Sequence, residues 1–139
     1  MKRFVLDASV ALAWFVDRPM APYAGRVRQI LLTGGRAVVP GLWQIEVANG
    51  FVVAERRGLL TAADSSPLLQ DLEVVIAQAV ENSGWSVSMR QALATARAFR
   101  LTTYDAVYLD TARVLGVPLA TLDRRLQDAA IQAGIELLQ

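Results

Sequence analysis

Short apolar runs alternate along this chain with longer stretches of helical spacing, and this alternation predicts strands separated by helices. Buried strands are predicted at residues 2–6, 37–39, 85–87, 117–120 and 135–138. Helices are predicted at residues 9–16, 24–32, 42–57, 61–80, 89–99, 104–115 and 123–133. Short apolar strands joined through helices favour a parallel sheet with both faces covered.

The helix predicted at residues 61–80 carries two opposing signals. Thr61, followed three residues later by Asp64, forms a weak capping box and marks the beginning of the helix. The run Ser65-Ser66-Pro67 then disturbs the pattern, so we expect a break near this point.

The length and the even pattern indicate a single domain over residues 1–139. The chain has no internal repeat, no low-complexity segment and no linker, and 139 residues suffice for a sizeable core. Apolar residues make up 54% of it, which is rich for a small protein and suggests apolar surface covered by a partner.

The chemistry open to the chain is restricted because it contains no cysteine and no histidine. Disulfides, zinc fingers, thiol nucleophiles and histidine bases are therefore excluded, and catalysis must use carboxylates, hydroxyls, backbone groups or a metal. The absence of cysteine fits the cytosol. A net charge of +1 provides no strong global field for nucleic acid.

The first residues, Met1-Lys2-Arg3, superficially resemble the start of a signal peptide. Asp7 interrupts the apolar region, and the apolar run Ala8–Val16 is too short to span a bilayer. We expect a soluble, cytoplasmic protein without a membrane segment.

Four acidic residues occupy positions that an α/β fold would bring together: Asp7, Glu46, Asp105 and Asp123. Asp7 ends the first predicted strand, Asp123 follows the fourth, and the other two lie in the first turns of predicted helices. Ligands bind at the carboxyl ends of parallel strands, so all four acids are expected at one rim. Crowded carboxylates repel each other, and a hard divalent cation is the usual reason to gather them. The pattern predicts metal-dependent chemistry at phosphate.

Three of these acids also have a structural interpretation. Asp7 could cap the helix that begins near Ser9, and Asp123 could be the N-cap of the last helix. Asp105 could be an acid favoured by the positive end of its own helix. These alternatives stay open on the sequence alone.

Glu46 differs from them because it stands beside Val47 and Ala48 on an otherwise apolar helix. A lone acid there would be a poor core residue, which favours a functional role. Asp110 and Asp128 are expected to lie on helix surfaces in contact with water.

Four segments carry the acids in chain order. They are Asp7-Ala8-Ser9, Trp43-Gln44-Ile45-Glu46-Val47-Ala48-Asn49, Tyr104-Asp105-Ala106-Val107-Tyr108 and Thr121-Leu122-Asp123-Arg124-Arg125-Leu126. Together they resemble the PIN-domain family, and more narrowly the VapC-type toxins of bacterial toxin–antitoxin modules. The resemblance covers nearly the whole chain, and no acidic position departs from it.

This resemblance implies a three-layer α/β/α domain with a central parallel sheet. It also implies an endoribonuclease that uses Mg²⁺ or Mn²⁺ to cleave single-stranded RNA with a metal-bound water. By motif, Asp7 and Asp105 are the firmest metal ligands, and Glu46 and Asp123 complete the set. Ser9 and Thr121 match the small hydroxyl positions of the family and are expected to support the site.

The resemblance further implies a homodimer and inhibition by a small cognate antitoxin. Two apolar segments are expected to be available for contact: the helix 42–57 with the turn Gly58-Leu59-Leu60, and the early helix around Leu12, Trp14 and Phe15. An apolar groove is expected to remain open for an amphipathic antitoxin helix. Arg124 and Arg125 are candidates for contacting RNA phosphates, with solvated surface arginines as the alternative.

Three other interpretations of the acidic positions compete with this resemblance. A receiver-type signalling domain would need a lysine near the end of a late strand, but Lys2 is the single lysine. A phosphatase with two aspartates spaced by one residue fails because Ser9 stands two positions after Asp7. A PIN-like binding module without catalysis keeps the fold and stays open.

Overall fold

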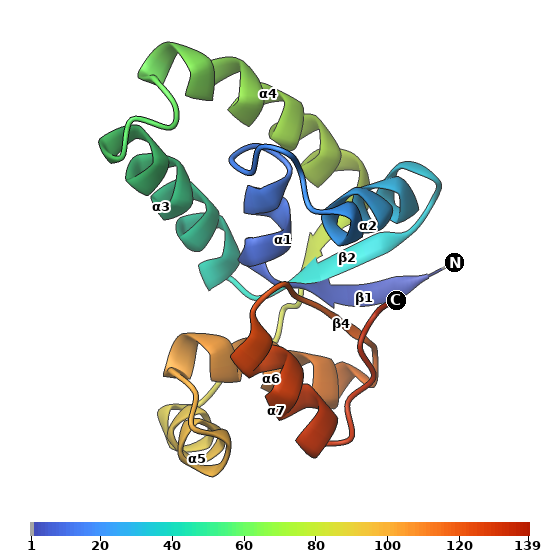
Figure 1. The fold of residues 1–139 in the computed structure, drawn as a ribbon. Helices are drawn as coiled ribbons and strands as arrows, with labels where there is room; N and C mark the ends of the chain where they lie inside the picture. The colour runs from blue at the N-terminus through green and yellow to red at the C-terminus, as the bar shows by residue number, and fades with distance from the viewer. Residues whose placement is uncertain (1) are drawn as a thin grey trace.

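A four-stranded parallel sheet lies between two layers of helices in the computed structural model, which describes residues 2–139 (Figure 1). The strands are β1 (Arg3–Leu6), β2 (Arg36–Val39), β3 (Val80–Asn82) and β4 (Leu119–Ala120), in the order β3-β2-β1-β4. All neighbouring strands are parallel. The predicted three-layer α/β/α class with a central parallel sheet is confirmed.

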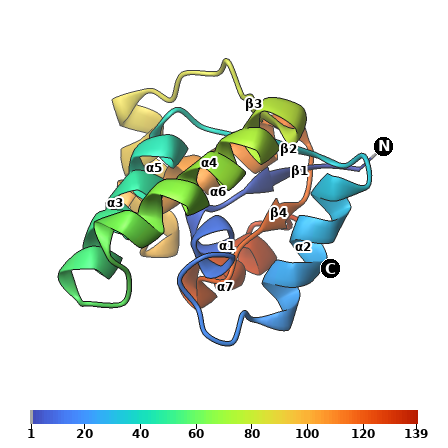
Figure 2. The same cartoon turned by 90° about the horizontal axis from the view of Figure 1, so that it is seen from above.

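Seven helices are present among residues 2–139. Those on one side of the sheet are α1 (Ala8–Ala13), α2 (Pro22–Leu32), α3 (Leu42–Arg56) and α4 (Ala62–Ala79) (Figure 1). Those on the other side are α5 (Met89–Phe99), α6 (Thr103–Leu115) and α7 (Arg124–Gln132). Seen from above, α3 and α4 lie nearest the viewer and partly hide α5 and α6 (Figure 2). None of these helices is long and apolar enough to cross a membrane.

The core explains the continuous apolar runs of the strands. Phe4, Val5 and Leu6 are completely buried, as expected for a parallel strand covered on both faces. Trp14 and Phe15 follow α1 and are also buried, with the Phe15 ring 5.9 Å from that of Phe51 on α3. The expectation that these two aromatic side chains are free for partner contact is therefore wrong.

The strand order places a topological switch between β1 and β4. The chain moves from β1 to β2 and β3 in one direction, and then crosses to the other side of β1 to form β4. Ligand sites of open α/β sheets lie at the carboxyl ends of the strands at such a point. Leu6 pairs with Ala120, so the residues that follow them, Asp7 and Thr121, leave the sheet side by side.

The strand predicted at residues 85–87 is wrong, because β3 directly follows α4 at Val80–Asn82. The edge of β2 that faces away from β1 is paired with β3, and the Ser83 N–H also donates to the Val39 carbonyl at this edge. Sequence patterning missed β3 because it is a polar edge strand. Its Glu81 forms a salt bridge of 2.8 Å with Arg3.

Two further differences concern α4 and the end of the chain. The Thr61–Asp64 capping box forms, but α4 continues unbroken through Pro67. The ring removes a hydrogen bond to the carbonyl of Ala63, an exposed residue where water can replace it. The strand predicted at 135–138 is reduced to one parallel bridge between Leu119 and Leu137.

Candidate active site

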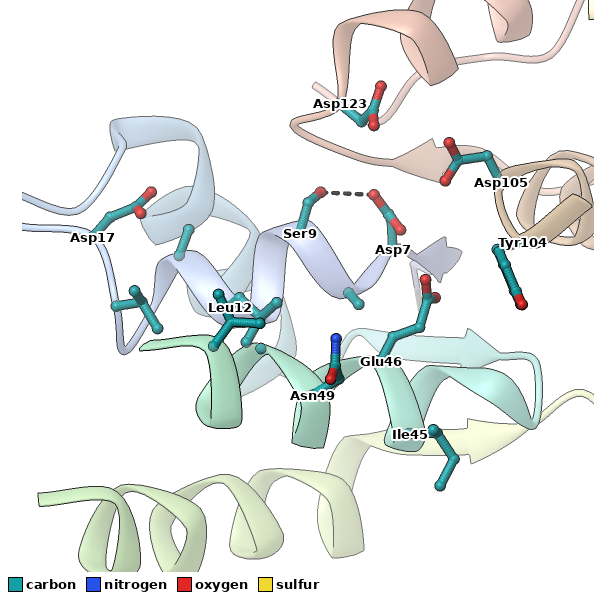
Figure 3. Close-up of a pocket in the computed structure, with 15 residues that line it drawn as sticks. Asp7, Ser9, Leu12, Asp17, Ile45, Glu46, Asn49, Tyr104, Asp105 and Asp123 are labelled. Atoms are coloured by element: carbon teal, nitrogen blue, oxygen red, sulfur yellow. Dashed lines mark hydrogen bonds between the residues drawn. The ribbon is translucent and has the colours of Figure 1, made fainter. Parts of the chain in front are cut away.

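An open cavity of about 710 Å³ lies at the carboxyl edge of β1 and β4. All four acids predicted to meet at one rim line this cavity: Asp7, Glu46, Asp105 and Asp123. They come from the end of β1, from α3, from α6 and from the residue before α7, and Figure 3 shows them around one opening. Away from the acids, the cavity continues over apolar side chains of α1 and α3.

Asp7 is the most enclosed of the four, with 5% of its surface exposed. Its side chain makes no capping bond to α1, although it stands at the N-cap position. Instead, Oδ2 accepts hydrogen bonds of 2.7 Å from both the Ser9 and the Thr121 hydroxyls. The capping interpretation of Asp7 therefore does not describe the structure.

The two hydroxyls are themselves held by the loop after β4. The Leu122 N–H donates to Ser9 Oγ at 3.0 Å, and the Asp123 N–H donates to Thr121 Oγ1 at 3.0 Å. Each hydroxyl thus accepts from the backbone and donates to Asp7, which fixes its direction. Both bonds fall on Oδ2, so neither hydroxyl occupies Oδ1. Burial raises the pKa of Asp7, and the two hydroxyl bonds oppose this rise.

Glu46 is held from the opposite layer of helices. The Tyr108 hydroxyl donates to Glu46 Oε1 at 2.6 Å, and Tyr108 is completely buried. Partial burial raises the pKa of Glu46, the Tyr108 bond lowers it, and the charges of Asp7 and Asp105 raise it further.

Asp105 lies in the first turn of α6, where Thr102 is the N-cap and accepts from the Asp105 N–H at 3.1 Å. Its pKa is raised to about 6, first by burial and then by the charges of Asp123 and Asp7. Here repulsion contributes, but burial is the larger cause.

Asp123 has the N-cap role that the sequence offered, and its role in the site stays a prediction. It is the N-cap of α7, and its Oδ1 accepts from the Leu126 N–H at 3.2 Å, while the side chain also lines the cavity. Arg124 and Arg125 follow it in the first turn of α7 and are exposed. The positive charge of Arg125 lowers the pKa of Asp105, against the larger effects of burial and of the neighbouring acids.

The acids are gathered without forming a complete ligand set for a metal ion. Within residues 2–139, no three acidic side chains stand close enough together to hold a metal. The donor chemistry fits a hard divalent cation, because the rim offers carboxylate oxygens. Burial first, and then the charges of neighbouring acids, raise the pKa values of Asp7, Glu46 and Asp105. A cation would relieve this repulsion and draw the carboxylates inward.

The sequence did not single out Tyr104, Ile45 or Tyr108 as site residues, nor Asp17, which also lines the cavity. Tyr104 and Ile45 line the opening and are 63% and 72% exposed, and Tyr108 holds Glu46 from below the surface. The signal for Tyr108 was its spacing: it follows Asp105 by three residues, so the two share one face of α6. Nothing in the pattern revealed that this face meets Glu46.

Asp110 corrects one expectation, because it is completely buried rather than solvated. It lies between α5 and α6, where Oδ1 accepts from the Thr95 hydroxyl at 2.8 Å and from Arg113 at 2.9 Å. α5 covers the α6 face that the sequence had assigned to water. Asp128 is exposed, as expected.

The fold and the acidic rim define the class of protein: the chain belongs to the PIN domain family, whose model matches residues 4–132. The chain is also similar to Ribonuclease VapC3 of Pyrobaculum aerophilum. The two are 30% identical over 126 residues, which cover 91% of this chain and 93% of that protein. The narrower resemblance to VapC-type proteins, predicted from the four motifs, is confirmed.

A solved structure gives the same fold. The crystal structure of PAE2754 from Pyrobaculum aerophilum aligns with a TM-score of 0.67 at 24% identity, covering 92% of this chain and 79% of that one. At this identity the likeness supports the fold alone. The family assignment removes the receiver-type and phosphatase interpretations.

Proposed function

We propose that the protein is a Mg²⁺- or Mn²⁺-dependent endoribonuclease that cleaves single-stranded RNA and acts as the toxin of a type II toxin–antitoxin module. The main support is the meeting of Asp7, Glu46, Asp105 and Asp123 at one cavity of a PIN domain similar to a VapC ribonuclease. Catalysis by cysteine or histidine is excluded by composition, so the reaction must use carboxylates, hydroxyls, backbone groups or a metal, and the carboxylates are the groups gathered at the cavity.

Asp7 and Asp105 would be the principal ligands, with Glu46 and Asp123 completing the set. A bound Mg²⁺ or Mn²⁺ would lower the pKa of the attacking water and stabilise the leaving oxygen. Ser9 and Thr121 keep Asp7 in one orientation through the two bonds to Oδ2. Because Asp7 is already held in one orientation, no conformational entropy is lost in fixing this carboxylate at each turnover.

The surroundings of the acids suit an unpaired RNA strand. Arg125 stands near Asp105 and could contact a phosphate next to the cleaved one, and Arg124 is exposed on the same turn. Tyr104 presents an exposed ring at the same opening, and unpaired bases stack on such rings. A duplex would keep its bases away from Tyr104.

Purified protein, freed of any antitoxin, is expected to cut single-stranded RNA with Mg²⁺ or Mn²⁺ and to stop when EDTA removes the metal. The reason is that the carboxylates alone repel both the phosphate and the nucleophile. Gel analysis of a labelled single strand, with the same sequence in a duplex as the control, measures this. Cleavage that survives EDTA would contradict metal dependence, and Mn²⁺ binding without cleavage would favour a catalytically silent binding module.

The toxin role requires a partner that silences the site inside the cytoplasm. We propose a small cognate antitoxin as that partner, on the grounds of the family similarity and of the apolar floor that continues from the acids over Leu12, Val16 and Val53. Co-expression with the protein encoded by the neighbouring short gene tests this, since the complex should lose cleavage. A complex that cut RNA at the full rate would rule out inhibition at the site.

A homodimer is the expected state of the isolated chain. Five large apolar side chains are exposed on α3, on the turn after it and on α4: Ile45, Val52, Leu59, Leu69 and Val74. A solvated monomer would leave this surface in water, at an unfavourable free energy of about 25 cal/mol per Å². Light scattering should give twice the chain mass, and Leu59→Asp should reduce it. A monomer at tens of micromolar would contradict the prediction.

A further inference from the structure

We propose that Tyr108 is a positioning residue that holds Glu46 in place at the acidic rim and leaves one carboxylate oxygen free for a divalent cation. This inference rests on the proposed function. It concerns a residue outside the acidic set, and the geometry of one short hydrogen bond carries it.

The bond joins the two helical layers at the site. Glu46 belongs to α3 and Tyr108 to α6, on opposite sides of the sheet (Figure 1). The Tyr108 hydroxyl donates to Glu46 Oε1 at 2.6 Å, a length typical of a strong O–H···O⁻ bond.

Glu46 needs such a partner more than the other acids do. Its side chain is the longest of the four and is only partly buried, so it has the most rotamer freedom to lose when it binds a ligand. Asp7 is fixed by two hydroxyls, and Asp123 is fixed by its capping bond to α7. In residues 2–139, the Tyr108 phenol is the side chain that hydrogen-bonds Glu46.

The phenol is suited to act as a permanent donor. Tyr108 is completely buried and its hydroxyl donates to Glu46 Oε1, so solvent does not compete for the donor. The bond occupies Oε1 and leaves Oε2 without a bond from Tyr108. Groups that hydrogen-bond a metal-ligating carboxylate typically contribute about 10- to 100-fold to metal affinity or activity.

Tyr108→Phe tests the inference, because it removes the hydroxyl and keeps the ring that fills the core. We expect the variant to bind Mn²⁺ about 10-fold more weakly, as measured by calorimetry on the protein without RNA, and to cleave RNA more slowly. Thr111→Val is the matched control. It also removes a hydroxyl from a completely buried α6 residue, but that hydroxyl binds the Val107 carbonyl, away from the acids.

A double-mutant cycle with Glu46→Gln separates positioning from a general loss of structure. If Tyr108 acts through Glu46, then Tyr108→Phe costs no further Mn²⁺ affinity in the Glu46→Gln background. An equal loss in both backgrounds, or an unchanged affinity in Tyr108→Phe alone, would overturn the inference. Wild-type protein that bound no Mn²⁺ at all would overturn the proposed function together with it, so the two failures are distinguishable.

Discussion

Asp7→Asn and Asp105→Asn are each expected to lower RNA cleavage by more than about a hundredfold while leaving the fold intact. Losing a group that only orients a metal ligand costs about 10- to 100-fold, so losing the ligand itself should cost more. The change is nearly isosteric, and the Asn oxygen can still accept the Ser9 and Thr121 bonds that now go to Asp7 Oδ2. Cleavage rates at saturating Mn²⁺ measure the effect.

In metal-free protein, the same two substitutions are expected to raise thermal stability. The raised pKa values of Asp7 and Asp105 mean that folding disfavours their charged forms, so neutral Asn should raise the melting temperature in EDTA. Asp128→Asn is the control, because this residue is exposed on α7 and should change cleavage by no more than about twofold. Asp110 is unsuitable for this purpose because it is buried against Thr95 and Arg113. A loss in Asp128→Asn as large as in the site variants would contradict the assignment of the site.

The affinity for Mn²⁺ is expected to fall steeply as the pH is lowered from 8 to 5. Protons and the cation compete for the same oxygens, and the Asp105 pKa is raised to about 6. At pH 5 only about one molecule in ten would keep Asp105 charged, so this residue alone should weaken binding about tenfold. Asp7 and Glu46, whose pKa values are also raised, should add to the effect. Calorimetric titrations across this range would contradict the cluster if the affinity stayed flat.

The thermal stability of the metal-free protein, unlike its affinity for Mn²⁺, should increase as the pH is lowered. The folded state binds the Asp105 proton more tightly than the unfolded state does, so stability falls as the pH rises from about 3.8 through about 6. Thermal unfolding in EDTA should therefore give a higher melting temperature at pH 5 than at pH 7. Asp105→Asn should flatten this dependence, which assigns it to the proposed residue.

Sequence patterning predicted the parts of the fold where local and global signals agree. The buried strands β1 and β2 are continuous apolar runs, and α4 begins with the Thr61 capping box. Patterning failed at β3, where a polar edge strand is stabilised by Arg3–Glu81 pairing between distant segments. Asp110 was misplaced for a similar reason, because whether a helix face meets water depends on which other helix covers it.

Three acids of the candidate site could be found because each stands at an element boundary that the pattern marks: Asp7, Asp105 and Asp123. Glu46 could be found because it is a lone acid on an otherwise apolar helix. Parallel strands bring such boundaries to one edge, so their meeting followed from topology. The Glu46–Tyr108 bond could not be found in this way. It depends on the distance between two helices in different layers, which the spacing within either helix does not determine.

The hydrogen bond from the Thr121 hydroxyl to Asp7 joins residues 114 positions apart, so it can form only late in the synthesis of the chain. A nascent chain that ends before β4 contains Asp7, Glu46 and Asp105 but lacks the loop that orients the Ser9 hydroxyl through Leu122. The site is therefore incomplete until the ribosome has released the last segment and β4 has joined the sheet. A prematurely terminated product would carry three of the four acids but would lack Asp123 and the bonds that hold the Ser9 and Thr121 hydroxyls against Asp7.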